Sequence, residues 1–394
     1  MTDVASPDER STVVSTLAEI TPEWLTTVLR ASGLADVKVV GLETEPGETT
    51  FCIKVYIRPI YDGLPGPQRL FLKFSKPVHP VTTPDTGREV QFYRNIAPHT
   101  PIDALVRCYD AAFDPVHHRW HVLLEDVSET HSSEPPSQLP FAQAQAEMVV
   151  EALAQIHAIW WDRPPFEISG QPWPNAEELE QRIAHVRSEV GDFIEFLGGR
   201  LSKPRHKTYE NVLQALPVLY TRLLDARGFS VVHDDVHIGN VLYPRTPADG
   251  VIRLVDWQTW HVDIAVKDLA HMMAVFWFPD TRRRLEVPLL ERYHTQLLAA
   301  GVSDYDWEHL WTDYRLCVLR KLFLAPHQWA TGHEPNIWWN HLERVMLAFD
   351  DLNCAELIGA SGDPSGDSAQ IESEALSTLR REQPHGANGT ISER

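Results

Sequence analysis

Alternating and helical patterns of apolar residues divide the first part of the chain. Residues 20–34 carry apolar side chains at helical spacing, and Thr21 followed by Pro22 is typical of a helix start. Three β-rich runs follow, and they are separated by residues 44–50 and by the turn-forming residues 61–67. The three runs cover residues 37–43, 51–60 and 68–77. Together they predict an antiparallel meander.

A helix and two further strands complete this region. Residues 85–97 have a helical period, with Asp85 available as the helix cap. Residues 105–114 and 120–127 then read as another strand pair. We therefore expect residues 1–127 to form a sheet-based lobe with one inserted helix.

The pattern changes after residue 128. Residues 128–140 are linker-like, and long helical patterns follow, beginning with residues 141–161. Two strands interrupt the helices at residues 229–233 and 251–257, with residues 240–244 and a turn at residues 247–250 between them. They predict a small hairpin inside a helical lobe that spans residues 128–360. Residues 361–394 are rich in Ser, Gly, Asp and Glu, which predicts a disordered tail.

Composition narrows the class of protein. Of the 394 residues, 43% are hydrophobic and 23% are charged, which is typical of a soluble globular protein. The chain has no apolar run of the length that a membrane helix needs and does not begin like a secretory signal, so we expect a cytoplasmic protein with no membrane partner. The four cysteines are scattered singly, which indicates reduced thiols.

The net charge bears on possible partners. A formal charge of -20 argues against a nucleic-acid partner, because phosphate backbones need a basic protein surface. The same charge weakly favours a cationic ligand, although solubility is the simpler explanation and the preferred one. The oligomeric state cannot be read from the sequence.

The segment VVHDDVHIGNVLYP carries the strongest chemical signal. An apolar strand ends at His233, Asp235 follows, and Asn240 lies five residues beyond Asp235. This is the spacing of a kinase catalytic loop, in which a carboxylate orients and deprotonates the attacking hydroxyl and an amide oxygen holds a metal ion. Asp256 comes sixteen residues after Asn240, at the end of the next strand, where a second magnesium ligand is needed.

A metal-dependent hydrolase is an alternative reading of the same segment. His233, Asp235 and His237 follow one another closely and could be zinc or iron ligands. No distant histidine pair completes a recognisable ligand set, and the positions of Asn240 and Asp256 have no purpose in such a site. The kinase reading accounts for more of the pattern.

The loop and the second motif resemble those of the aminoglycoside phosphotransferase, choline kinase and ecdysteroid-kinase-like superfamily. In that superfamily the loop commonly reads HGDxHxxN and is followed by a strand ending in Asp and then Phe or Trp, which corresponds here to Asp256 and Trp257. A DLA sequence at 268–270 sits where the family begins a helix. The departure is Asp234 in place of glycine, and the sequence leaves open whether its carboxylate adds charge beside Asp235 or points to solvent.

The resemblance also implies a nucleotide site in the first lobe. It assigns Lys73 to the ATP phosphates and Glu89 to the support of that lysine. It places the adenine-binding hinge at Glu125, Asp126 and Val127, where main-chain groups would contact the base. The phosphate-covering turn falls between the first two strands, with Thr49 and Thr50 as the candidate residues.

The fold implied by the resemblance is an α+β, bilobal, protein-kinase-like architecture. The implied activity is transfer of a phosphoryl group from ATP, with Mg²⁺ on Asn240 and Asp256 and with Asp235 as the catalytic base. The acceptor would be a hydroxyl of a small molecule, such as an aminoglycoside-like antibiotic, an amino sugar, an amino alcohol or a polycyclic alcohol. A catalytically silent nucleotide- or ligand-binding protein on the same scaffold is the alternative.

Tryptophans are numerous in the second lobe. Most fall at spacings that predict packing between helices. Trp260, Trp338 and Trp339 are also candidates for stacking on a ligand ring or facing a cationic amine.

Overall fold

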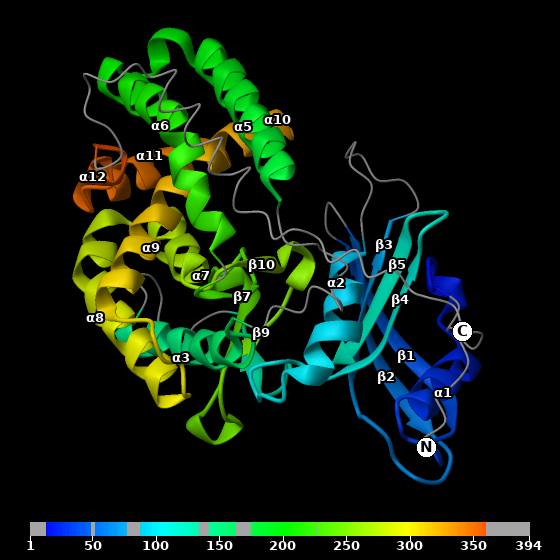
Figure 1. The fold of residues 1–394 in the computed structure, drawn as a ribbon. Helices are drawn as coiled ribbons and strands as arrows, with labels where there is room; N and C mark the ends of the chain where they lie inside the picture. Colours follow the sequence, from blue (N-terminus) through cyan, green and yellow to red (C-terminus); the bar gives the residue numbers. More distant parts are fainter. Residues whose placement is uncertain are drawn as a thin grey trace, which may run out of the picture.

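The first lobe of the protein is built on a five-stranded antiparallel sheet (Figure 1). The computed structural model describes residues 13–48, 52–76, 87–133, 142–162, 175–225 and 227–359. The strands lie in the order β1-β2-β3-β5-β4. Their bounds are Val39–Glu48 for β1, Cys52–Tyr61 for β2, Leu70–Ser75 for β3, Cys108–Asp114 for β4 and Arg119–Glu125 for β5. The predicted meander and the additional strand pair are confirmed.

The first strand is longer than the sequence pattern predicts. Residues 44–48, which we expected to belong to a turn, continue β1 and pair with residues 53–57 of β2. The prediction was wrong because Pro46 and Gly47 are typical of turns. The structure tolerates Pro46 because β1 is an edge strand, where a missing N–H group costs little.

The two faces of the sheet have different environments. Helix α1 (Pro22–Ala31), capped by Thr21 as predicted, packs on one face, where Leu72 and Phe74 are fully buried. Since successive side chains of a strand point to opposite faces, Lys73 lies on the other face, where it contacts Asp256 of the second lobe. The hydrophobic pattern of β3 therefore directs Lys73 toward the space between the lobes.

Helix α2 (Arg88–Gln91) connects the sheet to the second lobe. It continues as a π-helical turn over Phe92–Ile96, and its N-terminal cap is Gly87, with a φ of 67°. The helix is confirmed, whereas the predicted cap Asp85 lies outside the described residues. Phe92 stacks on Trp257 with ring centroids 3.9 Å apart, so α2 is in direct contact with the motif that contains Asp256.

The second lobe is mainly helical (Figure 1). Its helices are α3 (Gln143–Ile159), α5 (Ala176–Leu197), α6 (Lys203–Thr221), α7 (Lys267–Ala270), α8 (Pro279–Ala299), α9 (Trp307–Arg320), α10 (Leu324–Ala330), α11 (Pro335–Asp351) and α12 (Ala355–Gly359). The architecture is the bilobal α+β fold that the sequence predicts. The predicted tail at residues 361–394 lies outside the described residues. Among the described helices, none is long and apolar enough to cross a membrane.

Short strands frame the segment with the catalytic-loop spacing, but they pair differently from the prediction. Strand β7 (Phe229–Val232) pairs with β10 (His261–Ile264), which the sequence analysis did not predict. Strand β8 (Val241–Pro244) forms the hairpin with β9 (Arg253–Leu254) and also pairs with β6 (His131–Ser132), inside the predicted linker. A two-residue strand such as β6 has too little pattern to be recognised from sequence.

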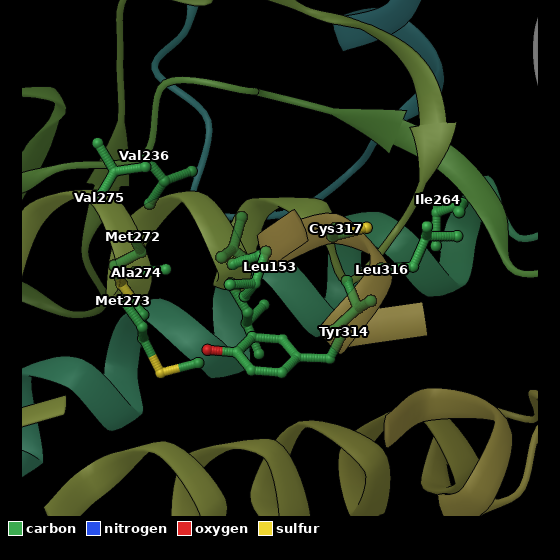
Figure 2. Close-up of a cluster of buried hydrophobic side chains, with 14 of the residues drawn as sticks. Leu153, Val236, Ile264, Met272, Met273, Ala274, Val275, Tyr314, Leu316 and Cys317 are labelled. Atoms are coloured by element: carbon green, nitrogen blue, oxygen red, sulfur yellow. The ribbon is translucent and has the colours of Figure 1, made fainter. Parts of the chain in front are cut away.

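A buried apolar cluster packs against this segment. Val236, which lies directly after Asp235, belongs to this cluster together with Val275 and with Tyr314 and Cys317 of α9, all of which are labelled in Figure 2. Val236 and Val275 are both fully buried. The backbone of the loop is thus fixed by an apolar anchor next to its predicted catalytic carboxylate. All four cysteines, which lie in the described ranges, are free thiols, as expected.

Candidate active site

Asp268 holds the backbone at the start of the predicted catalytic loop. Its carboxylate accepts hydrogen bonds from the main-chain N–H groups of His233, at 2.8 Å, and Asp234, at 2.7 Å. Asp268 is fully buried in α7, at the DLA sequence, so the predicted helix start is confirmed. His233 Nε2 lies 2.9 Å from the carbonyl oxygen of Val255. His233 therefore braces the loop against the strand that leads to Asp256.

Asp235 and Asn240, the residues predicted as base and metal ligand, are in contact. The Asn240 side-chain amide donates to the carbonyl oxygen of Asp235 at 2.9 Å and to its carboxylate Oδ2 at 3.0 Å. His271 Nε2 lies 3.3 Å from Asp235 Oδ1, and His237 Nε2 lies 3.6 Å from Oδ2. Burial alone would raise the pKa of Asp235, but the contacts with His237 and His271 outweigh it and hold the pKa well below its usual range. Asp235 is therefore a carboxylate at neutral pH.

Lys73, Glu89 and Asp256 form a second group across the lobes. Lys73 Nζ donates to Glu89 Oε2 and to Asp256 Oδ1, both at 2.8 Å. Burial opposes the charge of Lys73, but the two carboxylates outweigh this effect and raise its pKa, so the ammonium form is retained. The pair predicted from the sequence is thus formed, and it reaches the second lobe through Asp256.

The two groups adjoin each other through the main chain. The N–H of Val255, directly before Asp256, donates to the carbonyl oxygen of Asn240 at 3.1 Å. Asp256 itself has a φ of 68°, in the left-handed region, and its side chain is 30% exposed. This turn ends the strand and presents the carboxylate to Lys73.

The donor set around Asn240 and Asp256 fits a magnesium ion. The Asn240 amide nitrogen is engaged by Asp235, which leaves its side-chain oxygen as a ligand, and Asp256 contributes carboxylate oxygen. Mg²⁺ prefers oxygen ligands and is commonly held by one or two side chains together with substrate phosphates. Within the described ranges no three His, Cys, Asp or Glu side chains gather as a metal cage. His233 Nε2 is engaged by the carbonyl of Val255.

The predicted hinge follows β5. Asp126 is bound by its side chain to Arg69 Nε at 2.7 Å, and the carbonyl of Val127 accepts the N–H groups of Thr130 and His131. The main-chain N–H of Val127 has no hydrogen-bond partner among the described residues. Glu125 is exposed at the end of the strand. Val127 is therefore the hinge residue with a main-chain donor available for a ligand. Thr49 and Thr50 of the predicted phosphate turn lie outside the described residues.

Asp234 is engaged by buried cations. Its carboxylate contacts Lys321 Nζ at 2.6 Å and Lys267 Nζ at 3.1 Å, and His261 Nε2 lies 3.8 Å away. Burial alone would raise the pKa of Asp234, but the two lysines hold it well below its usual range. The structure resolves the question that the sequence left open, because the carboxylate is directed to two buried lysines and does not point to solvent.

An aromatic group with three histidines borders Asp235. Phe276 stacks on His237 with ring centroids 4.7 Å apart, and the centroids of His271 and His341 lie 5.3 Å and 5.1 Å from it. Burial lowers the pKa of His271, and it lowers that of His341 to about 4. Both side chains are therefore neutral at pH 7. The sequence analysis identified His237 but missed His271, His341 and the two lysines, because they lie on elements remote from the loop.

The tryptophans are mostly core residues, as expected. Trp257 and Trp260 are fully buried, and Trp260 Nε1 donates to the carbonyl of Arg88 at 2.7 Å. Trp338 is also buried, against Phe193. Trp260 therefore packs between the lobes and is not available to a ligand. Trp339 is only partly buried and stays a candidate.

Two hollows on the protein surface are lined by none of the residues predicted for catalysis or nucleotide binding. One is lined by residues that include Arg282, Trp311 and Asp351, and the other by residues that include Arg222 and Asp313. Arg282 is ion-paired to Asp351, and Arg222 is ion-paired to Asp313. The predicted catalytic and nucleotide-binding residues therefore lie outside both hollows, and Lys73 and Asp256 meet where the two lobes are in contact.

Comparison with known families agrees with this geometry. Residues 60–311 match the model of the phosphotransferase enzyme family, which is well over half of the chain. The chain belongs to this family. This phosphotransferase therefore transfers a phosphoryl group to a hydroxyl of a small molecule. No curated protein sequence matches it.

Solved structures agree on the fold. A provisionally assigned aminoglycoside phosphotransferase from Ralstonia eutropha JMP134 superposes with a TM-score of 0.51 at 14% identity, covering 84% of this chain and 98% of that one. Aminoglycoside 2'-phosphotransferase-IIIa in its GDP complex has a TM-score of 0.48 at 12% identity, covering 84% and 99%. A microcompartment-associated aminopropanol kinase has a TM-score of 0.44 at 13% identity, covering 85% and 98%. The first of these similarities shows the fold of the phosphotransferase.

Proposed function

We propose that the phosphotransferase uses ATP and Mg²⁺ to phosphorylate a small neutral alcohol with an apolar face. The observation that carries this proposal is that two groups of interacting side chains lie next to each other. Lys73 binds both Glu89 and Asp256, and the neighbouring Asn240 binds Asp235. Phosphoryl transfer requires a cation for the phosphates, oxygen ligands for a metal and a carboxylate for the acceptor, and these residues supply all three.

Each residue has a defined role in the proposed transfer. The Lys73 ammonium binds the phosphates of the substrate ATP, and Glu89 keeps it in place. Asn240 and Asp256 hold magnesium, which supplies charge neutralisation at the phosphate oxygens. Asp235 accepts the proton of the acceptor hydroxyl while the acceptor oxygen forms its bond to the γ-phosphorus. The bond from that phosphorus to the bridging oxygen of ADP breaks.

The adenine ring would lie against the hinge. The main-chain N–H of Val127 is the donor without a partner in this part of the described chain, and it follows the strand next to β3, which carries Lys73. A purine ring at Val127 places the phosphates along the sheet face that presents Lys73. Lys54 pairs directly with Lys73 across β2 and β3, so its side chain lies on the same face.

The surroundings of Asp235 favour a neutral acceptor over a polyamine. The bordering side chains are Phe276 and three histidines, of which His271 and His341 are neutral. The nearby carboxylate of Asp234 is already engaged by two lysines. An ammonium group that loses its water needs a carboxylate partner. A polyamine would therefore find little compensation here, whereas an apolar ring face would pack on Phe276.

Arg344 adds to the same argument. It lies one helical turn after His341 on α11, and its guanidinium stacks on the ring of Phe278 at 4.7 Å. Arg344 Nη1 donates to the carbonyl of Val275 at 3.3 Å, and in the part of the chain that the structure describes Arg344 has no ion-pair partner. A positive charge without a carboxylate partner beside this region further disfavours a cationic acceptor and suits a carbonyl or ester oxygen. We therefore favour neutral polycyclic alcohols over aminoglycosides, amino alcohols and macrolides that carry a basic amino sugar.

The experiment is ADP formation from MgATP with a panel of acceptors. The panel contains neutral polycyclic alcohols, macrolides, sugars, amino alcohols and aminoglycosides, each with wild type, Asp235→Asn and the surface control Asp249→Asn. We expect turnover with the neutral polycyclic alcohols, loss of turnover in Asp235→Asn and normal turnover in Asp249→Asn. Turnover with aminoglycosides alone would contradict the acceptor class.

Nucleotide binding is measured in the same samples. Wild type should bind MgATP, and Asp235→Asn should retain this binding because Asp235 acts on the acceptor. Absence of MgATP binding would contradict the proposed site. Tight binding without turnover across the panel would favour the silent scaffold.

A further inference from the structure

We infer that His271 is a positioning residue for Asp235, and that Lys321 and Asp234 hold its imidazole in the tautomer that donates from Nε2. The inference rests on the proposed function, in which Asp235 is the base. It assigns roles to three side chains outside the predicted set, all buried or partly buried beside the loop. It also gives a reason for an aspartate at the position where related loops have glycine.

The four side chains form a continuous line of contacts. Asp234 Oδ1 accepts from Lys321 Nζ at 2.6 Å, and Lys321 Nζ lies 2.7 Å from His271 Nδ1. On the other side of the ring, His271 Nε2 lies 3.3 Å from Asp235 Oδ1. The contacts therefore begin at Asp234 and end at Asp235, which are adjacent in the loop. They pass through Lys321, directly after α9, and His271, directly after α7.

The first two contacts fix the protonation of the ring. Burial lowers the pKa of Lys321, but the ionised carboxylate of Asp234 contacts its nitrogen directly and stabilises the ammonium. An ammonium group has only hydrogens to donate, so His271 Nδ1 must accept. A neutral imidazole carries a single proton, and that proton is then on Nε2. Burial and Lys321 both lower the pKa of His271, which keeps the ring neutral.

The Nε2 atom of His271 faces the carboxylate of Asp235. It is buried, and within the described ranges it has no well-aligned hydrogen-bond partner. A buried donor left without a partner is unfavourable. Such an atom is expected at functional sites, where contacts are often long without substrate and shorten when the complex forms. The carboxylate at 3.3 Å is its available acceptor.

The consequence concerns the orientation of the Asp235 carboxylate. Asn240 holds Oδ2 at 3.0 Å, and a donating His271 would hold Oδ1. A carboxylate restrained at both oxygens keeps one plane, so the lone pair that meets the acceptor hydroxyl has a fixed direction. Misplacement of a reacting group by about 1 Å costs roughly 100-fold in rate. His271 acts through Asp235 and does not itself touch the reacting atoms.

Two substitutions of His271 separate this role from simple packing. His271→Gln places an amide nitrogen near the position of Nε2 and keeps the donor, whereas His271→Asn places it near Nδ1 and loses the donor. We expect His271→Gln to retain kcat within about 10-fold and His271→Asn to lose about 100-fold in kcat with an unchanged KM for MgATP. Equal kcat values for the two variants would overturn the positioning role.

A double-mutant cycle tests whether Lys321 acts through His271. Lys321→Met should lower kcat in the wild-type background and have no further effect on kcat in the His271→Asn background. Additive losses would overturn the connection between the two residues. MgATP binding and thermal denaturation of each variant identify any protein that has not folded.

A measurement on the unmodified protein covers the case in which variants fail to fold. ¹⁵N chemical shifts of histidine-labelled wild type distinguish protonated from unprotonated ring nitrogens. A protonated Nε2 and an unprotonated Nδ1 in His271 support the inference, and the reverse pattern overturns it. Absence of any wild-type turnover would count against the proposed function, whereas normal wild-type turnover with equal His271 variants counts against the positioning role alone.

Discussion

Asp234 Oδ1 lies 2.6 Å from Lys321 Nζ, across 87 positions of sequence. The same carboxylate contacts Lys267, which also pairs with Asp263 at 2.8 Å, so Asp234 is shared by two buried lysines. Asp234 also has a φ of 60°, a left-handed conformation in which glycine is the residue without strain. The loop thus accepts an unfavourable backbone conformation at Asp234 in exchange for charge compensation.

Asp234→Asn should therefore destabilise the fold. The variant keeps the shape of the side chain but leaves Lys267 and Lys321 without their shared carboxylate, and we expect a loss of about 3 kcal/mol in the free energy of unfolding. Chemical denaturation measures it. Asp304 is the control, because it has a φ of 61° and is exposed, with no ion pair among the described residues. A change in Asp304→Asn as large as that in Asp234→Asn would contradict the charge argument.

Lys73→Met should impair nucleotide use. The substitution leaves Glu89 and Asp256 uncompensated where the ATP phosphates would bind, so we expect kcat/KM for MgATP to fall by about 100-fold or more. Steady-state kinetics with the acceptor found in the panel measure this. Lys38, an exposed lysine of the same lobe that pairs with Asp62, provides the control. If Lys38→Met lost as much activity, a specific role for Lys73 would be refuted.

Metal removal should stop turnover reversibly. Treatment with EDTA is expected to abolish ADP formation, and added Mg²⁺ should restore it, because the oxygen donors of Asn240 and Asp256 suit magnesium. Asp256→Asn should raise the Mg²⁺ concentration needed for half-maximal activity. Metal analysis of the purified protein should find no bound zinc. Retained zinc, with activity that depends on it, would argue for a hydrolase site.

Stability should decrease on mild acidification because of His341. Its pKa in the fold is about 4, below the value near 6.5 of an unfolded histidine, since burial disfavours the charged ring. The unfolded chain therefore binds a proton first, and stability that is complete above pH 6.5 is lost as pH falls toward 4. This group alone contributes a loss of about 2 kcal/mol between pH 7 and pH 5.

The variant His341→Asn tests that prediction. Asn retains a donor near the Nδ1 position, which lies 2.9 Å from Gln328 Oε1 in the native protein. Urea denaturation at pH 7 and pH 5 should show a smaller difference in unfolding free energy for this variant than for wild type. His185→Asn, at an exposed position, should behave like wild type. An unchanged pH difference in His341→Asn would show that another group is responsible.

The sequence was sufficient to predict the residues whose spacing is local. Asp235 and Asn240 belong to one loop, and Lys73 lies on a strand whose alternation can be read directly. The hairpin was mispredicted because β7 pairs with β10, a four-residue strand beyond the Asp256 motif, and pairing between short strands is decided by tertiary packing.

The partners of Asp234 and Asp235 could not be predicted from the sequence, for a different reason. His271 and Lys321 belong to helical segments whose apolar periodicity predicts only packing. Their polar side chains are buried at 4% and 6% exposure. A buried charge is stable only with a partner, but a single sequence does not say which residue that partner is. Asp234 in place of glycine was the one visible sign that additional charges were present.

The attachment of α2 to the second lobe has a consequence for control of the enzyme. Arg88 Nη1 donates to the carbonyl of Trp260 at 3.1 Å, Trp260 Nε1 donates back to the carbonyl of Arg88, and Phe92 stacks on Trp257. In protein kinases, displacement of the helix that carries the corresponding glutamate switches activity off. Here that helix is held to the second lobe by both backbone and ring contacts, which keep Glu89 beside Lys73. Control of activity by displacement of α2 would therefore require that these contacts break.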